Sequence, residues 1–287
     1  QKEIVGGKAL KGNLPRLLLA SFMNGDLDEA NKLIEKMERT TNLGTGHELH
    51  KGDYDFTATT LVTSLKLYGR GSEGGALMSP KAEDYMLGKL LQFDVRAEEI
   101  SKLAEGSFDL ACPNTARRIE ESENHTWMIL SSIYLVNKHR SEQNIGSSKV
   151  VENAGKFVND FEKRILKFIE YTKNAGLHEY NAIPYIAYTI TPLLNLEAFA
   201  SDEIRQGARD LLDHIFHSYA LSSLNGKNAS PFNRLASNAG ETSLVKDYRG
   251  SFVNAWVEDA PLEDLGVGGI THALIGSVMP YRLSEAT

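Results

Sequence analysis

The sequence predicts an all-α protein in which antiparallel helix pairs form a partial or incomplete (α/α) toroid. Several segments repeat apolar residues at helical spacing. Two others are apolar or small around most of the helical circumference, as is typical of helices buried on several sides. Strand patterning is weak, and no repeat indicates a regular solenoid. We expect one toroid-like domain over residues 1–287, because no domain boundary is evident.

Four amphipathic helices are predicted in chain order. The first lies within residues 25–40, where Asp26 precedes Glu29 at capping-box spacing; its apolar face comprises Leu27, Ala30, Leu33, Ile34 and Met37. The second lies within residues 79–93, with Ser79 as its N-cap and Pro80 at its first position. The third and fourth occupy residues 154–172 and 201–221, where apolar residues again recur at helical spacing.

The two more apolar segments, residues 55–69 and 125–136, are also predicted to be helices. Their Thr, Val and Ile residues favour strands, but the length of each run favours a helix. Alternation of such buried helices with amphipathic ones indicates layered helix pairs.

Irregular structure is expected at residues 43–53, 69–76, 112–115 and 225 to about 268. The last tract is longer than most structureless loops, so we expect it to fold over another part of the protein and to line a site. It contains Arg234, which could hold an anionic or hydroxyl-rich ligand or form a surface salt bridge.

Composition excludes several classes of protein. No stretch reaches the roughly 18 to 20 apolar residues that a membrane span needs, and a net charge of -7 argues against nucleic-acid binding. The single cysteine, Cys112, excludes an internal disulfide and a cysteine-rich zinc site. The chain begins at Gln1 rather than Met, so a removed export signal would make the protein secreted or periplasmic.

Glu123, Asn124 and His125 stand side by side at the start of an apolar run. Polar groups facing a core carry a desolvation cost unless they are hydrogen-bonded. One interpretation is helix capping and a buried hydrogen-bond network, with Trp127 in the core. The other is a ligand site, which we favour because few structural networks need three such groups consecutively.

A second polar cluster precedes an apolar helix in which Pro184 suits the first turn. An imidazole, a carboxylate and several phenols just ahead of a helix are well suited to lining a cleft. Each tyrosine alone would more often be a packing residue. The cluster comprises His178, Glu179, Tyr180, Asn181, Tyr185 and Tyr188.

A weaker candidate lies in "HELHKGDYD", residues 47–55. Its His-x-x-His spacing can bind a metal on a helix, but the local composition is typical of a loop. We therefore expect no metal. The polar residues of the segment are His47, Glu48, His50, Asp53 and Asp55.

The Asn-His pair opening a buried, aromatic-rich helix, followed later by a Tyr-x-x-Tyr segment that leads into "TPLLNLEAFA", resembles the helical-toroid polysaccharide lyases, particularly the alginate lyases. The resemblance covers residues 120–234 and places Asn124 and His125 on the Asn-His pair and Tyr185 on the catalytic tyrosine. Glu123 stands where the family has another Asn, and His178 lies nearest to the family's Arg. The same motifs also look like those of bacterial proteins associated with carbohydrate degradation.

The resemblance implies β-elimination on a uronate-containing polysaccharide or oligosaccharide, with no cofactor. Asn124 and Arg234 would neutralise the substrate carboxylate, and His125 and Tyr185 would act as base and acid, with Tyr180 as a substitute. Further substrate contacts would come from Trp127, His178, Tyr180 and Asn181.

Two alternatives remain open. A glycoside hydrolase would use Glu123 with Glu179, separated by roughly 5 Å for retention or roughly 6.5 to 9.5 Å for inversion. A non-catalytic glycan-binding helical protein would stack Trp127 and the tyrosines on sugar rings. The departure at Glu123 and the acidic net charge add weight to the hydrolase, but the lyase remains the favoured interpretation. The sequence leaves the glycan, the linkage and the oligomeric state open.

Overall fold

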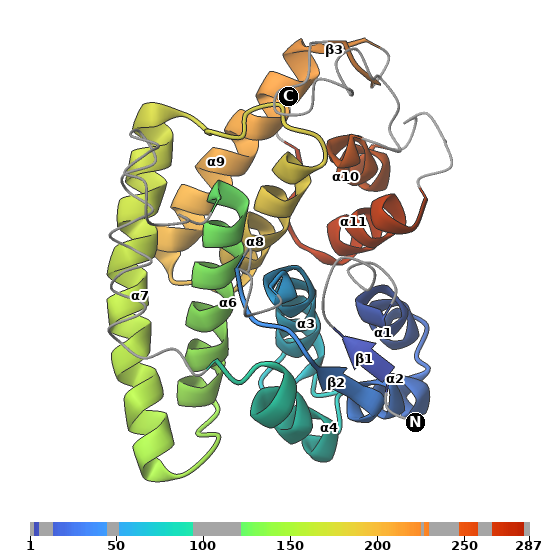
Figure 1. Cartoon of the computed structure of the whole chain (residues 1–287), viewed down its shortest axis with the longest axis vertical. Helices are drawn as coiled ribbons and strands as arrows, with labels where there is room; N and C mark the ends of the chain where they lie inside the picture. Colours follow the sequence, from blue (N-terminus) through green and yellow to red (C-terminus); the bar gives the residue numbers. More distant parts are fainter. Residues whose placement is uncertain are drawn as a thin grey trace.

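The computed structural model describes residues 3–5, 14–44, 52–93, 122–224, 227–229, 247–257 and 266–283, and most of these are helical (Figure 1). The all-α prediction is therefore confirmed for the described residues. The helices are α1 (Leu14–Met23), α2 (Leu27–Lys36), α3 (Tyr54–Tyr68), α4 (Pro80–Tyr85), a π-helical turn (Met86–Leu90), α6 (Glu123–Glu142), α7 (Ser148–Ala175), α8 (Tyr185–Phe199), α9 (Asp202–Leu221), α10 (Tyr248–Trp256) and α11 (Gly266–Val278).

The strands are short pairs at the periphery of the helices. β1 (Glu3–Val5) pairs in parallel with β2 (Met37–Arg39). β3 (Ser223–Leu224) pairs antiparallel with β4 (Lys227–Asn228), directly after α9.

Three buried helices, α3, α6 and α8, run in the same direction. Contacts between them advance together along all three helices: Asp55 with His125 and Thr59 with Ser132 between α3 and α6, and Phe56 with Tyr188 and Thr63 with Asn195 between α3 and α8. Hydroxyl and amide groups thus bridge the helices within an otherwise apolar core. The N-terminal ends of all three helices consequently meet at one end of the molecule.

Amphipathic helices surround this centre. α7 packs on α6, and α9 packs on both α7 and α8 (Figure 1). α10 and α11 pack on each other and on α8, while α1 contacts both α11 and α3. Contacts therefore pass from α3 through α6, α8, α10, α11 and α1 back to α3. α8 also contacts α3 and α11 directly.

The amphipathic and buried helices predicted from the sequence are all present, and the strand alternative for residues 55–69 and 125–136 is wrong. Ser79 caps α4 as expected, accepting a hydrogen bond from the Ala82 N–H at 3.2 Å. The capping-box prediction at Asp26 is wrong, because its side chain makes no capping hydrogen bond.

Two predicted boundaries also differ from the structure. The first amphipathic helix ends at Lys36, since Met37 enters a strand paired with residues distant in sequence. The tract from 225 to about 268 was expected to be irregular, yet it contains α10 and the start of α11. The α10 sequence, YRGSFVNAW, is poor in strong helix formers, so packing on α8 and α11 stabilises it more than propensity does.

Candidate functional site

Polar and aromatic side chains gather where α3, α6 and α8 begin, together with residues of α10 and α11. We call this group the N-terminal site and define it as Asp53, Asp55, His125, Tyr188, Tyr248 and His272. Helix N-termini present unpaired N–H groups and partial positive charge. This end of the molecule therefore favours acidic side chains and anionic ligands.

The shortest polar contact of the site joins His125 to Asp55. His125 Nδ1 lies 2.5 Å from Asp55 Oδ2, and both side chains are buried. The other carboxylate oxygen accepts the Gly44 N–H at 3.2 Å. An ionised carboxylate only accepts hydrogen bonds, so Nδ1 of a neutral His125 carries the proton and Nε2 keeps a lone pair. This imidazole is oriented to accept a proton at Nε2.

Asp53 lies beside that second nitrogen. Its Oδ1 is 3.8 Å from His125 Nε2, which is beyond hydrogen-bonding distance, and its side chain is 15% exposed. Asp53 has a φ of +72°, a conformation that Asp tolerates better than most residues, and its N–H donates to the Gly44 carbonyl at 2.6 Å. This turn directs the chain into α3 with Asp53 and Asp55 both at His125.

Aromatic rings line the other side of His125. The Phe56 ring meets His125 edge-on at 5.0 Å and Tyr188 edge-on at 4.5 Å between ring centres. Burial raises the pKa of Tyr188, and the neighbouring Tyr248, Tyr185 and Asp53 raise it further. The Tyr188 phenol therefore keeps its proton at neutral pH and can donate it.

Tyr248 and His272 complete the aromatic part of the site. The Tyr188 ring lies 6.3 Å from Tyr248 and 5.4 Å from His272, and Tyr248 lies 4.9 Å from His272. Burial lowers the pKa of His272 to about 3, so this imidazole is neutral at ordinary pH.

Glu123 and Glu179 tie the start of α6 to the turn before α8. The Glu179 N–H donates to Glu123 Oε2 at 3.1 Å, and the Asn124 N–H donates to Glu179 Oε2 at 3.4 Å. Both glutamates are buried. Burial raises the pKa of Glu123 to about 7, although the backbone N–H of His178 opposes the shift. The predicted pair is thus adjacent, and both carboxyl groups accept backbone N–H groups.

Asn124 has spare hydrogen-bonding capacity. Its Oδ1 accepts a hydrogen bond from the Ser122 hydroxyl, while its fully buried Nδ2 has no partner among the described residues. A buried donor left unpaired costs about 1 to 3 kcal/mol, so Asn124 retains a donor for a ligand or a water molecule.

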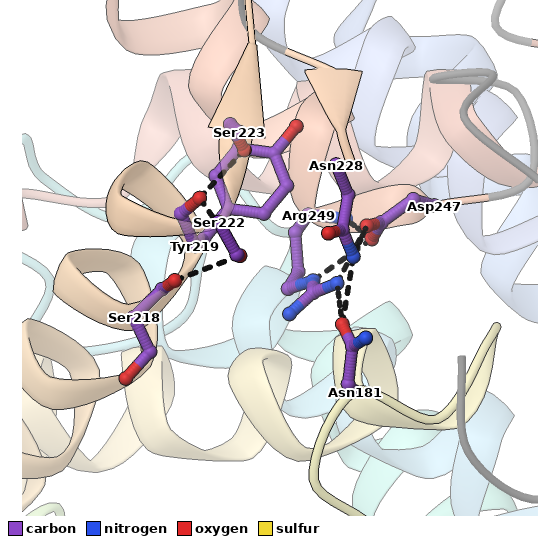
Figure 2. Close-up of polar contacts among 8 residues, drawn as sticks. All are labelled: Asn181, Ser218, Tyr219, Ser222, Ser223, Asn228, Asp247 and Arg249. Carbon is purple, nitrogen blue, oxygen red and sulfur yellow. Dashed lines mark hydrogen bonds and ion pairs between the residues drawn. The ribbon is translucent and has the colours of Figure 1, made fainter. Parts of the chain in front are cut away.

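Asn181 belongs to a buried charge cluster with Arg249, Asp247 and Asn228 (Figure 2). Arg249 binds both Asp247 oxygens, at 2.9 and 2.6 Å, and also donates to Asn181 Oδ1 at 2.5 Å. Asn228 Nδ2 donates to the same Asn181 oxygen at 2.7 Å. The Tyr219 ring covers the guanidinium at 5.0 Å. The cluster joins α10 and the β3–β4 hairpin to the turn before α8, and the Arg249 charge is matched by Asp247.

The remaining predicted residues are more dispersed. His178 is exposed, and Tyr180 is 48% exposed on the same turn. Trp127 is fully buried and packs on Phe168 at 4.4 Å, so its ring belongs to the core and the stacking role predicted for it has no exposed face. The other candidates lie outside the described residues; these are Arg234, His47, Glu48, His50 and Cys112.

Sequence reasoning did not connect several residues of this region. The sequence places Asp53 and Asp55 with His47 and His50 in a weak metal candidate, whereas Asp55 contacts His125, 70 residues away in the chain. Neither Tyr248 nor His272 is a candidate from the sequence: Tyr248 lies in the tract expected to be irregular, and His272 stands outside any polar cluster. Within the described residues, no group of three His, Cys, Asp or Glu side chains could hold a metal ion.

No family model, curated protein or solved structure matches this chain. Among the described helices, none has both the length and the apolar character needed to cross a bilayer.

Proposed function

We propose that the protein is a secreted or periplasmic polysaccharide lyase that cleaves a uronate-containing glycan by β-elimination. The observation that carries the proposal is the 2.5 Å contact between His125 and Asp55, beside a phenol that keeps its proton. A pre-oriented base and a nearby acid are the two groups that this reaction needs.

In the proposed reaction, His125 Nε2 takes the proton from the carbon beside the uronate carboxylate. The electrons of that C–H bond form a double bond to the next carbon, whose bond to the glycosidic oxygen breaks. The leaving oxygen receives a proton from Tyr188. Asp55 holds the imidazole in the required tautomer and stabilises the imidazolium that forms. The resemblance pointed to Tyr185, but Tyr188, one helical turn later, shares the Phe56 contact with His125.

The carboxylate beside that proton must be neutralised, because its charge opposes carbanion formation. Asn124 Nδ2 is a spare buried donor, and the converging helix N-termini supply further partial positive charge. Arg249 is already paired with Asp247, so we do not assign it this role. Arg234 remains a proposed contributor from the sequence.

The hydrolase is the second candidate, favoured by one specific observation. Glu123 has a pKa raised to about 7 and lies next to Glu179, and a carboxylic acid that keeps its proton near neutrality is what a general acid requires. Against it, both carboxyl groups are buried and already accept backbone N–H groups.

We also propose that the helices form a partial (α/α) toroid. Support comes from the parallel run of α3, α6 and α8, with α7 and α9 packed outside them, and from the contacts that lead through α10, α11 and α1 back to α3. In such a ring the N-terminal site would occupy one mouth.

The first experiment is incubation with a panel of uronate-containing and neutral polysaccharides. Ultraviolet absorbance of conjugated unsaturated uronate and new reducing ends are recorded together. Elimination raises both signals, whereas hydrolysis produces reducing ends without absorbance and shifts attention to Glu123. Saturable binding without turnover would contradict both enzymatic assignments and favour a glycan-binding protein.

A further inference from the structure

His272 is a buried imidazole that the reaction above does not use. It lies on α11, packed among Tyr188, Tyr248 and Phe252 with ring centres between 4.9 and 5.4 Å away. Among the described residues its side chain has one polar contact, from Nδ1 to the Thr191 hydroxyl at 3.5 Å. The other nitrogen, Nε2, has no hydrogen-bond partner among the described residues.

Thr191 determines which nitrogen of His272 carries the proton. The Thr191 hydroxyl donates its only hydrogen to the Ala187 carbonyl at 3.3 Å, so toward His272 it can act only as an acceptor. With that hydrogen committed to Ala187, a hydrogen bond at 3.5 Å requires the proton on Nδ1 of His272, which leaves a lone pair on Nε2. Because burial keeps the pKa of this imidazole near 3, Nε2 is an acceptor throughout the neutral range.

A buried acceptor without a partner carries a desolvation cost. An apolar side chain would fill the space between Tyr188, Tyr248 and Phe252 without that cost. The unpaired acceptor is instead part of the same aromatic group as the proposed acid, Tyr188. This arrangement is typical of a pocket in which a few placed polar groups orient a ligand.

We propose that Nε2 of His272 accepts a hydrogen bond from a sugar hydroxyl, in a subsite bounded by Tyr188 and Tyr248. The identity of the ligand as a glycan rests on the proposed function. A uronate carboxylate cannot donate a hydrogen bond, so the subsite binds a hydroxyl-bearing edge of the sugar. The carboxylate is left to Asn124 and the helix N-termini. His272 thus selects the orientation of the sugar.

The protonation of His272 can be tested without any ligand. In ¹⁵N-histidine-labelled protein, the two ring nitrogens of His272 are assigned by comparison with His272→Phe. We expect Nδ1 to show the shift of a protonated nitrogen and Nε2 that of an unprotonated one between pH 6 and 8. A protonated Nε2 would overturn the proposal, whatever the substrate is.

Ligand binding is then measured by calorimetry with a mannuronate tetrasaccharide and with cellotetraose as the neutral probe. We expect His272→Phe, which keeps an aromatic ring, to weaken binding about tenfold, the loss of one hydrogen bond. His272→Gln, which retains an acceptor, should recover part of that affinity. Thermal unfolding of each variant checks that the fold is intact.

The outcomes separate the two proposals. Equal affinity of the wild type and a folded His272→Phe variant would overturn the subsite and leave the lyase proposal standing. If the wild type binds neither tetrasaccharide and releases no product from the polysaccharide panel, the glycan ligand itself is wrong. If the His272→Phe variant loses affinity and the His272→Gln variant keeps part of it, His272 acts in binding as proposed. In that case KM of the His272→Phe variant should change more than its kcat.

Discussion

Helix α6 carries two buried His–carboxylate pairs, one at each end, and their surroundings differ. At the C-terminal end His139 Nε2 lies 2.7 Å from Glu83, and Arg70 Nε binds the other Glu83 oxygen at 3.1 Å. At the N-terminal end His125 lies 2.5 Å from Asp55, whose remaining oxygen accepts the Gly44 backbone N–H. The first pair is matched by a cation, whereas the second lies beside another carboxylate, Asp53.

The two pairs differ in whether the polar atoms around them have hydrogen-bond partners. Around Glu83 the acceptors meet side-chain and backbone donors from His139 and Arg70, which is how a structural ion pair is normally satisfied. Around Asp55, Asn124 Nδ2 is fully buried and has no partner among the described residues, His125 Nε2 has only the 3.8 Å approach to Asp53 among them, and His272 Nε2 makes no hydrogen bond to them. Such groups cost stability, so we interpret the N-terminal site as functional and the C-terminal pair as structural.

The largest expected effect comes from Asp55→Asn. The amide would donate to His125 Nδ1 and force the proton to Nε2, so the imidazole could no longer act as a base. We expect kcat on the identified polysaccharide to fall by about 10³ to 10⁴, as when the carboxylate of a Ser-His-Asp triad is replaced by an amide. The matched control is Glu83→Gln, the same change in the other pair. Equal losses of kcat in both variants would remove the distinction between them.

Tyr188→Phe is expected to have the next largest effect. It keeps the ring contacts with Phe56 and His272 but removes the proton donor, so kcat should fall by about 10² to 10³ with little change in melting temperature. Tyr185→Phe is the matched control from the same helix. If Tyr185→Phe abolishes formation of unsaturated product and Tyr188→Phe does not, Tyr185 is the acid that the resemblance implied.

Glu83→Gln should act on stability instead. Arg70 loses its buried counter-charge, while His139 can keep a hydrogen bond to the amide, so the free energy of unfolding should fall by about 2 kcal/mol. Urea denaturation measures the loss. Activity per folded molecule should be unchanged. A lower kcat in fully folded Glu83→Gln protein would show that the His139–Glu83 pair affects catalysis at the N-terminal site.

Helices with a clear contrast between faces were predictable from the sequence. In α9, Ile204, Ala208, Leu211 and Ile215 repeat at helical spacing and are all buried. α10 could not be found in this way, because Gly250, Ser251 and Asn254 interrupt its pattern. The parallel pairing of β1 with β2 also lacks a local signal, since it joins residues far apart in the chain.

The candidate site was predictable only in part, for a similar reason. Asn124 and His125 were noticed because consecutive polar residues open an apolar helix. Nothing near Asp55 or His272 indicates that either belongs with them, because those relationships arise when separate helices bring their ends together. Periodicity identifies buried faces, but partners of single polar residues depend on tertiary packing.

A pH-dependent effect on stability concerns Glu123, whose pKa is raised by burial from 4.5 to about 7. The folded protein therefore binds more protons than the unfolded chain between these values. Stability from this group is fully present below pH 4.5 and is lost as pH rises to about 7. Glu123→Gln removes the titration, so the variant should exceed the wild type by about 3 kcal/mol at pH 8 and match it at pH 4.5.

Urea denaturation across this pH range makes the comparison, with the exposed Glu152→Gln as the control expected to follow the wild type. Parallel curves for Glu123→Gln and the wild type would show that folding does not raise the pKa of Glu123. The activity of the Glu123→Gln variant provides a second test. In the lyase proposal Glu123 only positions the Glu179 backbone, and the amide oxygen can still accept that N–H, so kcat should fall less than tenfold. Loss of all activity in a folded Glu123→Gln variant would identify the Glu123 carboxyl as the general acid and favour hydrolysis.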